Sequence, residues 1–280
     1  MALIDDKTEI PETIYHYCNE KSFRGILKSK KLWLSDVHCM EDSTEQTWLI
    51  EKAKERLQEL NQGAIWWDIQ PIFDNFEWMA LDPHIFCFSS NINLPDQWRD
   101  YADDYRGYSI GFSSFWLINQ KNCCPRRQVL LWGAEYCEKK QMEFLNHYIE
   151  EYLTGLKQGK DRRDSGMRLV EAIYALSGAC KNPNFCEEKE IRLMVMEPRH
   201  PESFHDKYRQ GISERLYRSS EKYNKISYFT LPFPEHAITT IYLGPKNYAR
   251  DDDSSLKLFL AENSYNVNSI KIERSDATCR

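Results

Sequence analysis

Two glutamates spaced two residues apart, Glu188 and Glu190, are the strongest candidates for chemistry, and Arg192 continues their spacing. At the start of a strand these side chains would point to one face, because the side-chain period of a strand is two. Adjacent carboxylates repel each other unless a cation or a substrate hydroxyl lies between them, so the pair is suited to acid–base work or to stabilising positive charge. A solvated strand edge, with Lys189 and Arg192 as ion partners, is the structural alternative.

A histidine near the start of the chain lies between two tyrosines, Tyr15-His16-Tyr17, in a short predicted strand. Alternation along a strand places His16 on the face opposite to both tyrosines. One imidazole nitrogen can be fixed by a neighbour while the other donates a hydrogen bond, so His16 is a candidate ligand for a sugar hydroxyl or a phosphate. An ordinary core or surface histidine is the alternative.

A serine and three aromatic residues form the third candidate group. Ser89 lies at the end of a predicted apolar strand, and Trp98, Tyr101 and Tyr105 follow at helical spacing. On one side of a helix these rings would pack in the core or form a stacking wall for a nicotinamide or a base.

Composition limits the classes of function. The 280 residues carry 37 basic and 43 acidic side chains, a net charge of −6, so nucleic acid would be held by a local patch rather than by the whole surface. There is no long apolar run and no signal peptide, which predicts a cytoplasmic protein without a membrane partner. Nine cysteines without a Cys-x-x-C motif predict reduced thiols and no metal site.

The hydrophobic pattern predicts an α+β protein, because strands and helices are mixed without strict alternation. We expect a mostly antiparallel sheet with peripheral helices, in one domain over residues 1–280 with helical insertions near 44–80 and 139–180. The tail after Ser275 is expected to be frayed. Strands are predicted at 14–17, 31–37, 84–90, 108–113, 129–136, 190–197, 226–231, 238–243 and 267–272, and helices after Asn19, at 44–60, at 95–107, at 139–156, at 163–180 and at 254–261.

The order of several short motifs is more specific than any one of them. They are Ile14-Tyr15-His16-Tyr17, Ile26-Leu27-Lys28, Leu32-Trp33-Leu34-Ser35, Phe88-Ser89, Trp98-x-x-Tyr101-Ala102, Ile110-Gly111-Phe112, Glu188-x-Glu190-x-Arg192 and Ile241-x-Leu243-Gly244-Pro245-Lys246. Over about residues 14–248 this order resembles the domain-of-unknown-function family numbered 2971. That family in turn resembles the ADP-ribosyltransferase superfold, which includes toxins and phage-defence proteins.

The resemblance implies a split antiparallel sheet that grips NAD as co-substrate. It implies that His16 contacts the adenosine-side ribose and that Ser89 or Tyr101 lies against the nicotinamide side. A catalytic glutamate is implied at Glu190 or Glu188; the second glutamate of such a pair commonly contacts ribose, which favours Glu190. Tyr17, Trp98 and Arg192 are further candidates for binding NAD.

The expected activity is transfer of ADP-ribose from NAD to RNA, DNA or protein, with loss of nicotinamide. Carboxylate charge stabilises the oxocarbenium-like sugar of the transition state more than the ground state. Because such an activity is toxic to its own cell, we expect a toxin or anti-phage effector with a neutralising antitoxin or immunity protein. An NAD glycohydrolase, a non-catalytic NAD-binding module and a structural interaction protein are the alternatives.

Overall fold

Ten strands form a mostly antiparallel sheet in the computed structural model, which describes residues 10–39, 47–60, 64–79, 81–119, 129–198, 215–220, 222–250 and 254–279. The strand order is β10-β9-β4-β1-β3-β2-β8-β7, and β6 lies on β3 with β5 beside it. Only β10 and β9 run parallel among the strand pairs of these residues. The predicted α+β class is therefore confirmed. The strands are Thr13–Cys18 (β1), Lys31–Asp36 (β2), Leu81–Ser89 (β3), Tyr108–Ser113 (β4), Leu130–Gly133 (β5), Glu190–Pro198 (β6), Leu216–Ser220 (β7), Asn224–Pro232 (β8), Ile238–Leu243 (β9) and Lys271–Arg274 (β10).

Strand β3 is the centre of the sheet because it pairs with three other strands. Strand β6 covers the whole of one edge, from Leu81 to Ser89. On the opposite edge β2 pairs at His84 and Ile85, and β1 pairs at Ser89. Strands β1 and β2 therefore share one edge of β3, and Cys87 lies between their two points of contact.

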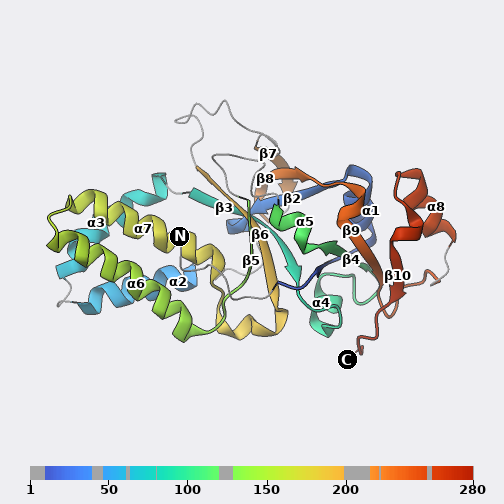
Figure 1. Ribbon diagram of the computed structural model, residues 1–280, viewed down its shortest axis with the longest axis horizontal. Coiled ribbons are helices and arrows are strands. Elements are labelled where there is room, and N and C mark those ends of the chain that lie inside the picture. Colours follow the sequence, from blue (N-terminus) through green and yellow to red (C-terminus); the bar gives the residue numbers. More distant parts are fainter. Residues whose placement is uncertain are drawn as a thin grey trace.

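The helices lie in two places around the sheet. Figure 1 shows α2, α3, α6 and α7 gathered into a bundle beside one end of β3 and β6, with α1 and α8 near the opposite end of the molecule. The bundle has its own apolar core, which includes Leu57, Ile69, Leu145 and Ile173. The helices are Glu20–Ser29 (α1), Thr47–Glu59 (α2), Ala64–Met79 (α3), Pro95–Asp100 (α4), Ser114–Asn119 (α5), Glu138–Lys157 (α6), Arg162–Ala179 (α7) and Ser254–Glu262 (α8), with short 3-10 turns at Val37–Cys39 (η1), Pro183–Glu188 (η4), Glu235–Ala237 (η6) and Val267–Ser269 (η7).

Helix α1 shows how local sequence sets an element. The Asn19 side chain accepts a hydrogen bond from the backbone N–H of Ser22, 2.9 Å away, which confirms the predicted N-cap. Phe23 and Leu27 are buried one turn apart, and the helix stops at Lys30, whose φ of 52° is left-handed.

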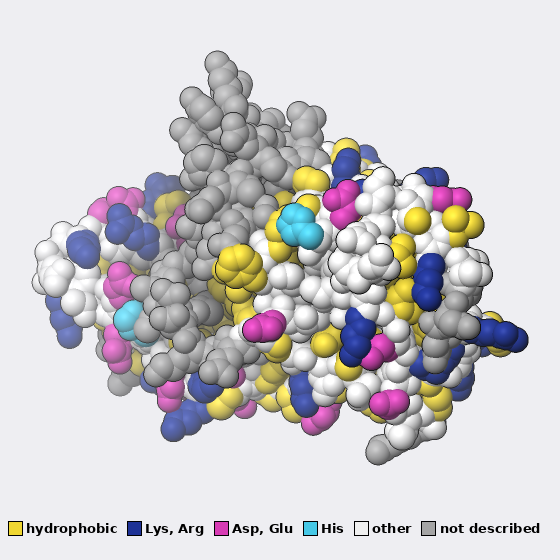
Figure 2. Space-filling view, turned by 45° about the vertical axis from the view of Figure 1, so that its right-hand side comes forward, with side chains coloured by type: hydrophobic (Ala, Val, Ile, Leu, Met, Phe, Trp, Pro, Cys, Tyr) yellow, Lys and Arg dark blue, Asp and Glu magenta, His cyan; other side chains and the backbone are white. Residues whose placement is uncertain are grey.

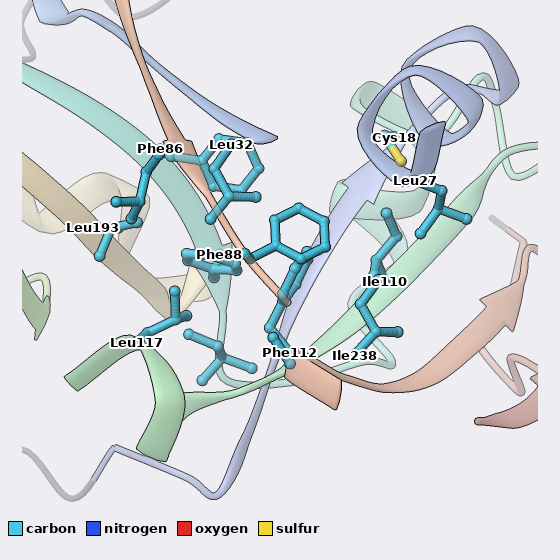
Figure 3. Close-up of a cluster of buried hydrophobic side chains, with 14 of the residues drawn as sticks. Cys18, Leu27, Leu32, Phe86, Phe88, Ile110, Phe112, Leu117, Leu193 and Ile238 are labelled. Carbon is cyan, nitrogen blue, oxygen red and sulfur yellow. The ribbon is translucent and has the colours of Figure 1, made fainter. Parts of the chain in front are cut away.

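The main apolar core lies on one face of the sheet. Figure 3 shows Phe86 and Phe88 of β3 close to Leu32 of β2 and Leu193 of β6. Phe112 of β4 packs on Phe88, with ring centres 5.6 Å apart. The space-filling view in Figure 2 shows basic and acidic side chains interspersed over the visible surface, in keeping with the small net charge. Within the described residues, no helix combines the length and apolarity needed to cross a bilayer.

The predicted helix from Pro95 to Gly107 is wrong in its second half. Helix α4 ends at Asp100, because Asp103, Asp104 and Tyr105 all have left-handed φ angles between 49° and 68°. Gly107 then passes so close to β1 that a Cβ there would lie 2.3 Å from the Cys18 carbonyl oxygen.

The C-terminal prediction is also corrected. Residues 267–269 form the turn η7, and the last strand begins at Lys271. The residues after Ser275 are not frayed: the Ser275 hydroxyl lies 3.1 Å from Asn93 Oδ1, and Ala277 is buried in a cluster with Tyr17 and Trp98. Strand β7 and helix α5 were not predicted. Strand β7 is exposed along almost its whole length, so it lacks an apolar alternation, and α5 spans less than two turns.

Candidate functional site

Four charged side chains meet next to the end of β6 that faces Ser89. The ammonium of Lys181 lies 2.6 Å from Glu188 Oε2 and 2.9 Å from Glu190 Oε2. The guanidinium of Arg192 donates to both oxygens of Glu190, at 3.1 and 3.0 Å, and also to the Gly178 carbonyl at 2.9 Å. Two carboxylates and two cations balance each other, so the charges can be buried together. We call these four residues the ion cluster.

Three segments bring the ion cluster together. Glu190 and Arg192 point to the same face of β6, as the alternation predicted. Lys181 follows the C-cap of α7, and its backbone is held by hydrogen bonds with Glu135 and with the Gln141 side chain.

Glu188 reaches the ion cluster by a different route from the one predicted. It ends the turn η4 and is not part of the strand, because Lys189 has a left-handed φ of 48°. The proposed ion partner Lys189 is exposed, whereas Lys181 takes that place. The two carboxylates therefore meet at a shared ammonium group and not through strand alternation.

Burial and charge set the protonation of the groups around the ion cluster. Burial alone would lower the pKa of Lys181, but the carboxylates of Glu190 and Glu188 outweigh it and raise the pKa, so the ammonium stays charged. Burial raises the pKa of the Cys87 thiol well above its usual range, and Glu190, which shares a hydrogen bond with it, adds to the rise. Cys87 is thus a thiol at neutral pH and not a ready nucleophile.

The two glutamates differ in how far a ligand can reach them. The Glu190 side chain is 7% exposed and Lys181 is 6% exposed, whereas Glu188 is 22% exposed. Tyr101 is 43% exposed, and burial of its hydroxyl together with the nearby charge of Glu188 raises its pKa, so the phenol keeps its proton. Glu188 and Tyr101 are therefore the groups that a ligand would meet first.

Ser89 lies beside these groups, but its hydroxyl is already used. It donates to the Glu188 carbonyl oxygen at 2.9 Å and accepts from the backbone N–H of Asn91 at 3.2 Å. The side chain is buried at the end of β3. Ser89 thus fixes the turn that carries Glu188.

His16 lies on the other face of the sheet. Tyr15 pairs with Ser89, and Ser89 pairs with Glu190, so these three side chains lie on one face of the sheet. His16 follows Tyr15 in β1, and strand alternation therefore places it on the opposite face. The His16 ring packs against Phe86 of the main core, with centres 4.2 Å apart. The structure therefore does not bring His16 together with the ion cluster.

The protonation of His16 also differs from the expected donor role. Its Nδ1 lies 2.9 Å from the Cys87 carbonyl oxygen, which can only accept, so Nδ1 carries the hydrogen. Burial lowers the pKa of His16 to about 4, although the bond to Cys87 opposes the shift. At neutral pH the ring is uncharged, so Nε2 is an acceptor and not a donor.

Tyr17 and Trp98 belong to a buried aromatic cluster. Their rings meet edge to face with centres 5.0 Å apart, and both side chains are buried. The Tyr17 hydroxyl donates to the Asn91 carbonyl at 2.7 Å, and Trp98 Nε1 donates to the Ile92 carbonyl at 2.8 Å. The predicted common side for Trp98, Tyr101 and Tyr105 is wrong, because the helix ends at Asp100 and Tyr101 turns outward.

Two members of the site were not predicted. Lys181 lies between α7 and η4, outside any strand, and the signal for it is that a buried Glu-x-Glu-x-Arg run needs a second cation. The Tyr136 hydroxyl accepts from the backbone N–H of Glu190 at 3.1 Å. Burial and the charge of Glu190 raise the pKa of Tyr136.

In the described residues, no three His, Cys, Asp or Glu side chains are grouped as metal ligands would be.

Comparison with known proteins gives one match. Residues 97–193 match the family model described as "Protein of unknown function (DUF2971)", over about a third of the chain. The matched range includes Tyr101 and the whole ion cluster but not the motifs around His16 or Gly244. Searches among curated proteins and among solved structures gave no match, so the likeness is not extended to ADP-ribosyltransferases.

Proposed function

We propose that this chain is an enzyme that transfers ADP-ribose from NAD to a macromolecular acceptor, with Glu188 as the carboxylate that meets the substrate. The observation that supports this most directly is the arrangement of Glu188: its carboxylate is fixed by the buried Lys181 ammonium yet remains partly exposed beside the Tyr101 phenol. The motif order resembles the family numbered 2971, and the resemblance of that family to the ADP-ribosyltransferase superfold is the reason for proposing NAD as the substrate.

The reaction needs little beyond positioned charge. The bond between the ribose C1′ and the nicotinamide nitrogen breaks, and its electron pair neutralises the pyridinium of the leaving group. The positive charge left on the sugar is stabilised by a nearby carboxylate, the role we assign to Glu188. An acceptor oxygen or nitrogen then bonds to C1′, and its proton passes to the carboxylate.

The other residues of the ion cluster act on Glu188 and not on substrate. Lys181 holds the Glu188 carboxylate, Glu190 helps to keep Lys181 charged, and Arg192 holds Glu190 in place. Both oxygens of Glu190 accept from cations, which leaves it poorly placed to contact ribose itself. Tyr101, protonated at neutral pH, can donate to a sugar hydroxyl or to the nicotinamide amide.

The roles that the resemblance implies for the remaining residues fit only in part. Tyr17 and Trp98 support the neighbouring backbone from within the buried aromatic cluster. His16 could serve a ligand only from the opposite face of β3, and there as an acceptor through Nε2. We propose a toxin or anti-phage effector, acting inside the cell on RNA, DNA or protein and restrained by a neutralising partner.

The test is incubation of the purified protein with labelled NAD and separate pools of RNA, DNA and protein. We expect label to enter one pool, and Glu188→Gln to lower the rate about 100- to 1,000-fold in protein that remains folded. The loss of stability should be smaller than for a change at Arg192, because Lys181 keeps Glu190 as a partner. The matched control is Glu187→Gln, an exposed neighbour that should react like the unaltered protein.

Three other outcomes would point elsewhere. Free ADP-ribose without a labelled pool would favour an NAD glycohydrolase. NAD binding without release of nicotinamide would favour a binding module in which the ion cluster is purely structural, as the saturated bonding of Glu190 would allow. Folded protein that neither binds nor cleaves NAD would overturn the proposal.

A further inference from the structure

The hairpin of β7 and β8 is a basic segment in an acidic protein. Residues 215–225 contain Arg215, Arg218, Lys222 and Lys225 against one acidic residue, whereas the whole chain has a net charge of −6. Strand β7 is the terminal strand of the sheet order. Arg218 and Lys225 have no carboxylate partner among the described residues. Positive charge is therefore concentrated on one edge of the sheet.

Exposed aromatic rings lie next to this charge. Trp33 of β2 stacks on Tyr228 of β8, with ring centres 4.6 Å apart and planes 22° from parallel. Trp33 is nonetheless 41% exposed, so part of its ring remains open to solvent. The Arg218 guanidinium lies 5.9 Å from the centre of the Trp33 ring and donates to Ser35 Oγ at 3.1 Å. These contacts hold a flat ring and a cation side by side.

Strand register puts the members of this surface on one face. Ser35 pairs with Tyr228, and Tyr228 pairs with Leu216, so these three side chains lie on one face of the sheet. Trp33 is two residues from Ser35 and Arg218 is two residues from Leu216, so both lie on the same face. We call Trp33, Tyr228 and Arg218 the aromatic platform. On the other face of the same hairpin, the Lys225 ammonium lies 3.9 Å from the centre of the exposed Tyr217 ring, which repeats the pairing of cation and ring.

We propose that the aromatic platform and the basic hairpin bind single-stranded nucleic acid. A base can extend the Trp33–Tyr228 stack as a third ring, with its phosphate at Arg218 on the same face. The strand then passes over the edge of the hairpin, where its next phosphates meet Lys225 on the other face. A duplex buries its base faces and needs a longer basic stripe than this acidic chain offers, so the unpaired strand fits better.

The aromatic platform also faces the same way as the ion cluster. Ser35 pairs with Ile85 of β3, and Ile85 shares its face with Cys87, which pairs with Arg192. A strand held at Trp33 would therefore lie on the cluster side of the sheet. The inference concerns binding alone and holds whether or not the chain consumes NAD.

The test measures binding without NAD. Fluorescein-labelled single strands of RNA and of DNA, about 12 nucleotides long, are titrated with the protein and followed by fluorescence anisotropy at about 50 mM and about 200 mM salt. We expect Trp33→Ala to weaken binding by about 10-fold or more and Trp33→Phe by less, since Phe keeps a ring. Arg218→Ala and Lys225→Ala should each weaken binding and reduce the salt slope by about one.

Matched controls come from the helical bundle. Trp67 of α3 is 72% exposed and Lys139 of α6 lies far along the chain from the hairpin, so Trp67→Ala and Lys139→Ala should leave affinity unchanged. Quenching of tryptophan fluorescence by the strand should disappear in Trp33→Phe and persist in Trp67→Phe. Binding to RNA alone or to DNA alone would support the proposal and name the strand.

Three results would overturn it. The first is folded protein that binds neither single strand at the lower salt. The second is binding that Trp33→Ala and Arg218→Ala leave unchanged. The third is equal affinity for a duplex of the same length, because stacking on Trp33 requires an unpaired base.

Discussion

The two faces of β3 bury polar groups in different ways. On one face, Cys87 and Ser89 lie beside the ion cluster, where every charge has an opposite charge in contact. On the other face, Phe86 and Phe88 enclose His16, which remains neutral and uses one nitrogen to bind a backbone carbonyl. The first arrangement depends on several partners at once, and the second depends on the ring staying uncharged. Substitutions in the ion cluster and a fall in pH around His16 should therefore destabilise the protein in different ways.

The largest effect is expected on the charged face. Arg192→Met removes a fully buried cation and leaves Lys181 as the remaining cation beside Glu190, so we expect the free energy of unfolding to fall by about 3–5 kcal/mol. Chemical denaturation measures it. Arg192→Lys should lower the free energy of unfolding by less, because the positive charge stays while the bidentate contact with Glu190 is lost. A loss below about 1 kcal/mol for Arg192→Met would show that the cluster is not held by charge balance.

A smaller effect is expected on the apolar face, and only in acid. The pKa of His16 is about 4 in the folded protein and about 6.5 when unfolded, so the unfolded chain binds more protons between these values. Stability is therefore complete above about pH 6.5 and falls as the pH drops toward 4, by about 2–3 kcal/mol from this residue. Glutamine at position 16 keeps a donor but does not titrate.

The measurement compares unfolding free energies of the unaltered protein and His16→Gln from about pH 7.5 to about pH 4.5. Acidic groups titrate in both proteins, so the difference between the two curves isolates His16. We expect the difference in unfolding free energy between the two proteins to change by most of the predicted amount, about 2 kcal/mol or more, across this pH range. Parallel curves would mean that His16 is accessible enough to be protonated without cost.

The smallest effect separates a structural role of Tyr17 from a role in binding NAD. Tyr17→Phe removes the hydroxyl that donates to the Asn91 carbonyl and should lower the unfolding free energy by about 1 kcal/mol. Because the ring and its contact with Trp98 remain, NAD turnover should not change. A large loss of NAD turnover at unchanged stability would instead indicate that the Tyr17 hydroxyl contacts the substrate.

Periodicity was sufficient to predict most elements of the fold. Strand alternation predicted that Glu190 and Arg192 lie on the same face, and that His16 lies on the face opposite to Tyr15 and Tyr17. Asn19 was predicted as the start of α1. These features depend on neighbours along the chain, which is what a single sequence displays most directly.

The errors at the candidate site depend on backbone angles or on contacts between segments. Lys189 is left-handed although it is not glycine, so nothing in its type signals that Glu188 leaves the strand. Asp103, Asp104 and Tyr105 are also left-handed, which prevents the predicted helix from continuing to Gly107. Lys181 lies in a different segment from β6, and only the three-dimensional arrangement shows it between two carboxylates.

The bundle and the sheet have separate apolar cores, yet the ion cluster joins them. Helix α7 contributes to the bundle core, while the carbonyl of Gly178 in its last turn accepts from Arg192 and Lys181 follows directly after. Proteins open locally in cooperative units, and a separate core makes the bundle such a unit. Any opening that releases the end of α7 also withdraws the ammonium from both glutamates. Local opening at the end of α7 therefore also removes the counter-charge of Glu188.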